Sequence, residues 1–149
     1  LGQRSFGPMR AQLVYGSDYF NNANSQIVTL AMIETQEAVN NIDEILSVKN
    51  LNGVYIGPAD MSIAYGLEPK FDVKEDPVFS NIKLIVKKAK EYGKIAGIHN
   101  GTTQYAKEMI ALGYQFITIS SDYRGMTSFN QKIVKEMKEI EKDQKSSTY

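Results

Sequence analysis

Four short apolar runs alternate along the chain with segments in which apolar residues recur at helical spacing. The runs span residues 27–33, 54–56, 95–98 and 115–120. They are rich in Ile and Val and show no polar alternation, which is typical of parallel strands that are buried on both faces. Because a helical pattern follows each run, the chain is predicted to form a parallel sheet with covering helices.

Capping signals place the boundaries of two of the predicted helices. Asp76 and Pro77 suit the N-cap and the first position of a long helix, which Gly93 ends. The last helix is predicted to begin at about Ser128 and to carry a row of apolar residues, starting with Phe129, on one face.

Two architectures accommodate four strand–helix units: an open doubly wound sheet and part of an eight-stranded (β/α)8 TIM barrel. No G-x-G-x-x-G sequence follows any of the runs, which disfavours a dinucleotide-binding sheet. A closed barrel typically needs about 250 residues, so a chain of 149 residues suits part of one. The chain begins at Leu1 rather than at Met, which indicates a fragment, although processing or trimming gives the same start. The expected division is lead-in helices over 1–26, four βα units over 27–143 and a tail over 144–149.

Composition narrows the class of protein. Lys and Arg together number 17, as do Asp and Glu, so the net charge is zero. Nucleic-acid binding needs a basic excess or a basic stripe. The balanced charge therefore argues against nucleic acid as the main partner. The absence of cysteine excludes disulfides and thiolate metal sites. No segment resembles a signal peptide or a membrane span, so a cytoplasmic protein with no membrane partner is expected.

Acidic residues follow the first two predicted strands. Glu34 lies at the end of the first run in "AMIET", and Asp60 lies just past the second run in "IGPAD". Ligands of parallel α/β folds lie at the carboxyl ends of the strands, and neighbouring strands are about 4.8 Å apart. If the two strands are neighbours, both carboxylates can reach one divalent cation. Mg²⁺ or Mn²⁺ is the consistent choice, because these ions prefer oxygen ligands.

Both acids also have simpler interpretations. Asp60 is well placed to cap a helix, and Glu34 can favour the start of the next helix electrostatically. Two acids at consecutive strand ends, one of them beside Gly57, Pro58 and Ala59, shift the balance toward a site. Gly57 allows close backbone approach, and the amides that open the following helix can hold a carboxylate or phosphate.

Six segments, in this order, carry a family resemblance: "GQRSFGPMRA", "YGSDYFNNAN", "MIETQEAVNNIDEIL", "NGVYIGPADMSIAYG", "GKIAGIH" and "GYQFITISSD". The chain closely resembles the metal-dependent pyruvate aldolases of the HpcH/HpaI family, which includes 4-hydroxy-2-oxoheptanedioate aldolase and 2-dehydro-3-deoxyglucarate aldolase. The resemblance covers nearly the whole chain. It implies a TIM barrel of the phosphoenolpyruvate/pyruvate type, of which this chain supplies about the last four βα units.

The resemblance also implies roles for individual residues. Glu34 and Asp60 would ligate the metal, which is expected to be Mg²⁺ or Mn²⁺, with Co²⁺ or Zn²⁺ as alternatives. The backbone from Gly57 to Ala59 would hold the carboxylate of pyruvate. Met32 stands where many relatives have Gln, and His99 is expected to line the pocket rather than to act as the base. The general base and a substrate-binding arginine of the family would lie upstream of this chain.

The implied activity is that of a carbon–carbon lyase. It cleaves 4-hydroxy-2-oxo acids to pyruvate and an aldehyde through a metal-stabilised pyruvate enolate, in the catabolism of aromatic compounds or sugar acids. A citrate-lyase-like acyl-CoA lyase on the same scaffold and a catalytically incomplete half-barrel are the alternatives. The resemblance further implies a homo-oligomer, a trimer or hexamer, in which the C-terminal helix contacts a partner through Phe129, Ile133 and Met137.

Overall fold

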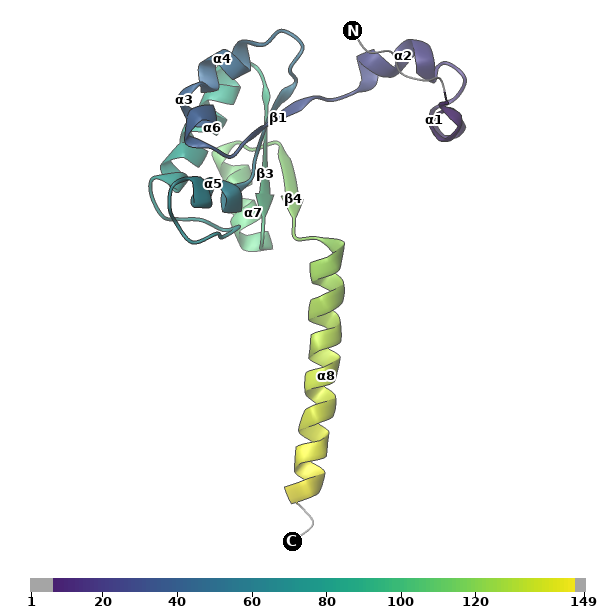
Figure 1. The fold of residues 1–149 in the computed structure, drawn as a ribbon, viewed down its shortest axis with the longest axis vertical. Coiled ribbons are helices and arrows are strands. Elements are labelled where there is room, and N and C mark those ends of the chain that lie inside the picture. The colour runs from purple at the N-terminus through teal and green to yellow at the C-terminus, as the bar shows by residue number, and fades with distance from the viewer. Residues whose placement is uncertain (1–6, 147–149) are drawn as a thin grey trace.

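The computed structural model describes residues 7–146, with side chains described for residues 7–138. At its centre lies a sheet of four parallel strands arranged in sequence order (Figure 1). The strands are β1 (Leu30–Ile33), β2 (Gly53–Ile56), β3 (Ile95–Asn100) and β4 (Phe116–Ile119). All four predicted strands are therefore present.

Eight helices accompany the sheet in the described residues. They are α1 (Met9–Tyr15), α2 (Tyr19–Gln26), α3 (Gln36–Asn40), α4 (Ile42–Ser47), α5 (Pro58–Ala64), α6 (Val78–Glu91), α7 (Thr103–Leu112) and α8 (Asp122–Ser146). Helices α3 to α7 lie on one side of the sheet (Figure 1). Helix α6 packs against β2 and β3, and α7 packs against β3 and β4. The sheet is thus covered from one side by the helices that connect its strands.

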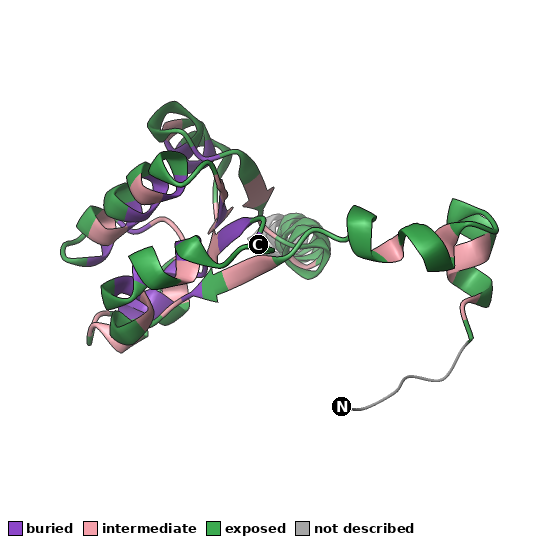
Figure 2. Cartoon of the chain, turned by 90° about the horizontal axis from the view of Figure 1, so that it is seen from above, coloured by how far each residue is buried: buried purple, intermediate pink, exposed green. Residues whose placement is uncertain are grey.

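The hydrophobic core lies between the sheet and these helices, where Figure 2 shows the buried segments gathered. Ile33, Val54 and Ile56 point to this side and are fully buried, which stabilises the fold by about 2 kcal/mol for each side chain. On the opposite face of the sheet, Met32 is 53% exposed and Phe116 is 46% exposed. The prediction of strands buried on both faces is therefore wrong for the described chain, because its helices cover only one face.

Helix α6 begins one residue later than predicted. It starts at Val78, so Pro77 rather than Asp76 occupies the N-cap. Asp76 still accepts hydrogen bonds from the hydroxyl of Ser80 at 2.6 Å and from its backbone N–H at 3.0 Å. These bonds hold the pKa of Asp76 below its ordinary value. The aspartate therefore satisfies a free N–H of the first turn from one position further out.

Helix α8 begins earlier than predicted, at Asp122 instead of about Ser128. The hydroxyl of Ser121 accepts from the N–H of Arg124 at 3.3 Å, and its carbonyl accepts from the N–H of Gly125 at 3.0 Å. These bonds start the helix ahead of Gly125. The cost of a glycine in a helix, roughly 1 kcal/mol, is too small to prevent this start.

Helices α1, α2 and α8 extend away from the sheet and its covering helices (Figures 1 and 2). On α8 the apolar side chains Phe129, Ile133 and Met137 are all exposed. Their contact with a partner subunit stays a prediction. Within the described residues, no helix is both long and apolar enough to cross a membrane.

Two parts of the predicted organisation fall at the ends of the chain. Residues 1–6, which carry the start of the "GQRSFGPMRA" segment, lie outside the described residues, as do residues 147–149 of the predicted tail. The described part of that tail continues α8 as far as Ser146.

Candidate metal and substrate site

A cavity of about 200 Å³ lies at the carboxyl ends of β1, β2 and β3. Its lining residues are Met32, Glu34, Tyr55, Gly57, Pro58, Ala59, Asp60, Phe71 and His99. All seven residues that the sequence suggested for the site therefore lie around one cavity, at the edge of the sheet where a parallel α/β fold binds ligands. The individual roles of these residues stay predictions.

Strand pairing brings Glu34 next to Gly57. Ile33 at the end of β1 pairs with Ile56 at the end of β2, so the residues that follow them also lie side by side. A Cβ at position 57 would lie 3.0 Å from Cδ of Glu34 and closer still to its Oε1. Only glycine leaves room for the carboxylate in this position, which is a close-packing requirement rather than a conformational one.

Asp60 lies in the first turn of α5 rather than at its N-cap. The helix begins at Pro58, with Gly57 as the N-cap, so the interpretation of Asp60 as an N-cap residue is wrong. The reason is that proline at the first helical position starts the helix earlier. The carboxylate of Asp60 is exposed and faces the same cavity as Glu34.

The two carboxylates influence each other electrostatically. Partial burial raises the pKa of Glu34, and the negative charge of Asp60 raises this pKa further. Both effects make a second negative charge unfavourable in the cavity unless a cation is present. The pair is therefore electrostatically suited to bind positive charge.

The donor set favours a hard divalent cation. Among the residues that the structure describes, no group of three or more His, Cys, Asp or Glu side chains is arranged to hold a metal ion. A structural zinc site needs four ligands, usually nitrogen or sulfur, and is not provided. Mg²⁺ and Mn²⁺ bind through one or two carboxylates and complete their coordination with water and substrate oxygens, which fits Glu34 and Asp60.

Backbone groups beside the acids complete this part of the cavity. Gly57 and Pro58 are buried, and Ala59 is half-buried. The carbonyl of Gly57 accepts from the N–H of Met61 at 2.9 Å, which closes the first turn of α5. Pro58 has no N–H, so the N–H groups of Ala59 and Asp60 are the ones in this turn without an acceptor in the helix, and an anionic group in the cavity can accept from them.

A polar group that was not predicted from the sequence lies on the other side of the cavity. Nδ1 of His99 lies 2.9 Å from the hydroxyl of Thr118, which is also hydrogen bonded to the hydroxyl of Tyr55. Successive side chains of a strand point to opposite faces, so Tyr55, two positions before Gly57, lies on the same face as Gly57. This alternation is the signal by which these residues could have been predicted from the sequence.

An aromatic residue from the loop between α5 and α6 covers His99. The ring of Phe71 meets the imidazole edge-on, with ring centroids 4.9 Å apart, and the guanidinium of Arg124 lies 4.9 Å from the centre of the Phe71 ring. The neighbouring Asp72 ties the loop to the end of β3 by accepting from the N–H of Gly101 at 2.7 Å and from the hydroxyl of Thr102 at 2.6 Å. The loop is thereby fixed over the cavity.

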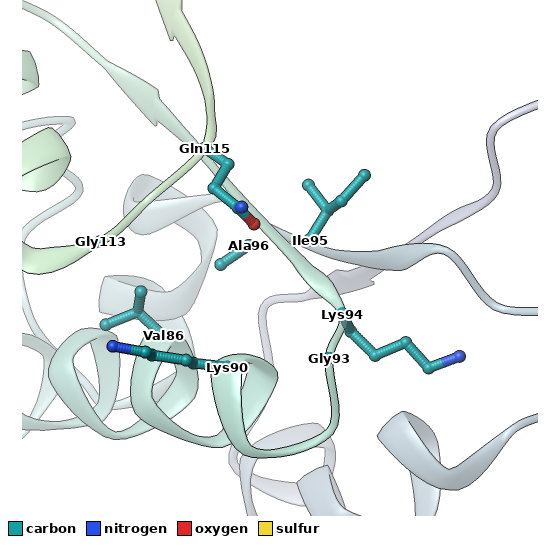
Figure 3. Close-up of a pocket in the computed structure, with 8 residues that line it drawn as sticks. All are labelled: Val86, Lys90, Gly93, Lys94, Ile95, Ala96, Gly113 and Gln115. Carbon is teal, nitrogen blue, oxygen red and sulfur yellow. The ribbon is translucent and has the colours of Figure 1, made fainter.

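A larger hollow of about 370 Å³ lies at the amino end of the sheet. Figure 3 shows its lining, in which the side chains of Lys90 and Lys94 point in opposite directions. The ammonium of Lys94 donates to the carbonyls of Leu51 and Val48, so its contacts are structural. No charged groups converge in this hollow, and we therefore place the candidate site at the carboxyl end.

The family model of HpcH/HpaI aldolase/citrate lyase matches residues 4–128. The chain belongs to this family. Within it, a hydroxypyruvate/pyruvate aldolase of Rhizorhabdus wittichii is 41% identical over 133 residues, which are 89% of this chain and 53% of that protein. A 4-hydroxy-2-oxo-heptane-1,7-dioate aldolase of Escherichia coli is 36% identical over 105 residues, which are 70% of this chain and 39% of that protein. The chain thus spans about half the length of the first relative, and less of the second.

Solved structures show the same fold. The HpcH/HpaI aldolase of Desulfitobacterium hafniense superposes with a TM-score of 0.77 at 25% identity, over 93% of this chain and 54% of that chain. Together with the four parallel strands in sequence order, this confirms the predicted α/β fold of a TIM barrel, of which the chain contains four βα units. The predicted relationship to the HpcH/HpaI family is likewise confirmed.

Proposed function

We propose that the protein is a metal-dependent aldolase that cleaves 4-hydroxy-2-oxo acids to pyruvate and an aldehyde, and that joins them in the reverse direction. One observation carries the proposal: Glu34 and Asp60 share a cavity with the backbone of Gly57 to Ala59 at the carboxyl ends of two neighbouring strands. Membership in the family and the similarity to two aldolases support it.

The chain's own residues bind and orient the reactants in this proposal. Glu34 and Asp60 hold the divalent cation. When bound, such a cation supplies positive charge that stabilises the negative charge developing on the keto oxygen of pyruvate. The free N–H groups in the first turn of α5 orient the carboxylate of pyruvate, so that its methyl carbon faces the aldehyde.

The proton on the methyl carbon needs a base. Among the described lining residues, His99 carries the imidazole that most often serves as a general base, and its Nδ1 is engaged by Thr118. We therefore assign His99 to the lining of the cavity and expect the base to come from outside residues 7–138.

Exchange of the methyl protons of pyruvate in D₂O tests the proposal, because exchange requires the same proton removal without an aldehyde. The full-length protein should exchange them with Mg²⁺ or Mn²⁺, and a chelator or the substitution Glu34→Gln should stop the exchange. Exchange that persists with chelator and in Glu34→Gln would contradict the metal-dependent reaction.

A second candidate is an acyl-CoA lyase of the citrate-lyase type, since the description of the matched family includes citrate lyase. The same two acids would hold the cation in that reaction. A panel of CoA thioesters separates the two functions: turnover of a thioester, without exchange of pyruvate protons, would favour the lyase. The homo-oligomeric state, the catabolic role and the cytoplasmic location stay predictions from the sequence.

A further inference from the structure

Three polar side chains from three strands form a hydrogen-bonded chain on the open face of the sheet, and the proposed reaction does not use it. Tyr55 on β2 is hydrogen bonded to Thr118 on β4, and Thr118 lies 2.9 Å from Nδ1 of His99 on β3. Gly97 makes this reach possible, because a Cβ there would lie 2.7 Å from Cδ2 of Tyr55. The tyrosine therefore crosses β3 over a residue without a side chain.

The chemistry of the three groups sets the direction of their hydrogen bonds. A phenolic O–H is a stronger hydrogen-bond donor than an aliphatic hydroxyl, so we assign Tyr55 as the donor to Thr118. With Tyr55 as the donor in that bond, the hydroxyl proton of Thr118 is directed to its other described partner, Nδ1 of His99. Nδ1 therefore accepts, and the proton of the neutral imidazole lies on Nε2.

His99 occupies the part of the cavity that lies away from the acids. Glu34 follows β1 and Gly57 follows β2, while His99 belongs to β3. At about 4.8 Å per strand, the backbone of His99 is roughly 10 Å from that of Glu34. The two acids and His99 therefore line opposite ends of the cavity, and the ring of Phe71 lies against the imidazole at the second end.

We propose that His99 is a specificity-determining residue whose Nε2–H donates a hydrogen bond to an oxygen substituent on the aldehyde part of the substrate. The inference rests on the proposed aldolase function and deepens it by naming the residue that selects an aldehyde with an oxygen substituent over an alkyl aldehyde. An alkyl aldehyde of the same size would leave the Nε2–H without an acceptor, and such a site discriminates against it. Thr118 and Tyr55 act as positioning residues.

Glycolaldehyde and propanal provide a matched pair of substrates, because a hydroxyl in one replaces a methyl group in the other. In the condensation with pyruvate, the full-length protein should prefer glycolaldehyde in kcat/KM by about tenfold or more. His99→Leu and Thr118→Val should each remove about tenfold of this preference. Thr118→Ser should retain it because it keeps the hydroxyl, and Thr103→Val, at an exposed position of α7, is the matched control. A wild-type protein without the preference, or a preference that survives both His99→Leu and Thr118→Val, would overturn the proposal.

The tautomer of His99 provides a readout that does not depend on activity. Nitrogen-15 NMR, with the signal assigned by its loss in His99→Gln, should show the proton on Nε2 in the wild type and in Thr118→Ser. In Thr118→Val it should show a mixture of tautomers. A proton on Nδ1 in the wild type would contradict the assigned hydrogen bonds. Failure of pyruvate proton exchange in the wild type would instead count against the aldolase function. The experiment therefore distinguishes failure of the His99 proposal from failure of the aldolase proposal.

Discussion

The two ends of the parallel sheet differ in what their hollows bring together. One hollow at the amino end measures about 370 Å³, yet Lys90 and Lys94 point apart in it (Figure 3). The cavity at the carboxyl end measures about 200 Å³, and there Glu34 and Asp60 lie close enough for the charge of one to raise the pKa of the other. Convergent charge, rather than volume, therefore distinguishes the candidate site.

This difference follows from the way a parallel sheet is built. Each strand ends at the same edge and continues into a loop or helix start that can place a side chain over the cavity. At the amino end, the ammonium group of Lys94 instead donates to the carbonyls of Leu51 and Val48, which are structural contacts. The predictions below test whether function is confined to the carboxyl end.

The largest effect is expected from the acids. Glu34→Gln and Asp60→Asn should each lower the rate of pyruvate proton exchange on the order of 100- to 1,000-fold, because each removes charge that holds the cation. The double variant should lose little more than either single variant, because the two residues act as one unit. Lys90→Gln at the amino end should keep the rate within about twofold of the wild type. An equal loss of rate in Lys90→Gln would contradict the claim that function is confined to the carboxyl end.

A smaller loss is expected from filling the space beside Glu34. Gly57→Ala places a methyl group where the carboxylate now lies, so Glu34 must move. Displacement by about 1 Å can lower a rate on the order of 100-fold, and the same kinetic assay measures it. Gly125→Ala is the matched control, because its Cβ would meet open space within α8. Unchanged exchange in Gly57→Ala would show that the contact with Glu34 is not required.

The loop over the cavity should matter for stability. Asp72→Ala removes the acceptor for Gly101 and Thr102, and we expect it to lower the free energy of unfolding by about 2 kcal/mol in urea titrations. The Michaelis constant should also rise, because Phe71 is no longer held over His99. Glu68→Ala, in the same loop but with a side chain that is 80% exposed, should change neither quantity measurably. Equal effects of the two variants would argue against a fixed loop.

The smallest effect is expected from an ion pair between the covering helices α4 and α6. Lys88 donates to Asp43 at 2.9 Å, and this hydrogen bond holds the pKa of Asp43 below its ordinary value of 3.8. The ionised carboxylate is favoured in the folded state, so the contribution is complete above pH 3.8 and is lost as the pH falls through the lowered pKa. The urea midpoints of wild type and Lys88→Met should therefore converge in acid. A difference between the two urea midpoints that does not depend on pH would show that the effect comes from packing. The rate of pyruvate proton exchange should be the same in Lys88→Met as in the wild type.

Much of this arrangement could be predicted from the sequence. The apolar runs located the strands, and parallel pairing then required Glu34 and Asp60 to meet at one edge. The "IET" and "GPAD" segments indicated the family relationship. They also predicted that the backbone from Gly57 to Ala59 belongs to the site. These features depend on local sequence and on strand order, both of which a single chain displays.

Contacts across several strands could not be predicted in the same way. The bond between Tyr55 and Thr118 depends on the register of three strands and on the missing side chain of Gly97. The placement of Phe71 depends on Asp72, which binds to a turn far along the chain. The start of α8 was misplaced because the capping hydrogen bonds of Ser121 begin the helix ahead of its apolar face.

Binding of Mn²⁺ tests the central claim most directly, namely that Glu34 and Asp60 at the carboxyl end of the sheet hold a divalent cation. Free Mn²⁺ gives a sharp electron paramagnetic resonance signal that disappears on binding, so titration of the full-length protein counts the bound ions. The wild type and Lys90→Gln should each bind Mn²⁺ at a site that Glu34→Gln and Asp60→Asn both lose. Equal binding by all four proteins would contradict the account.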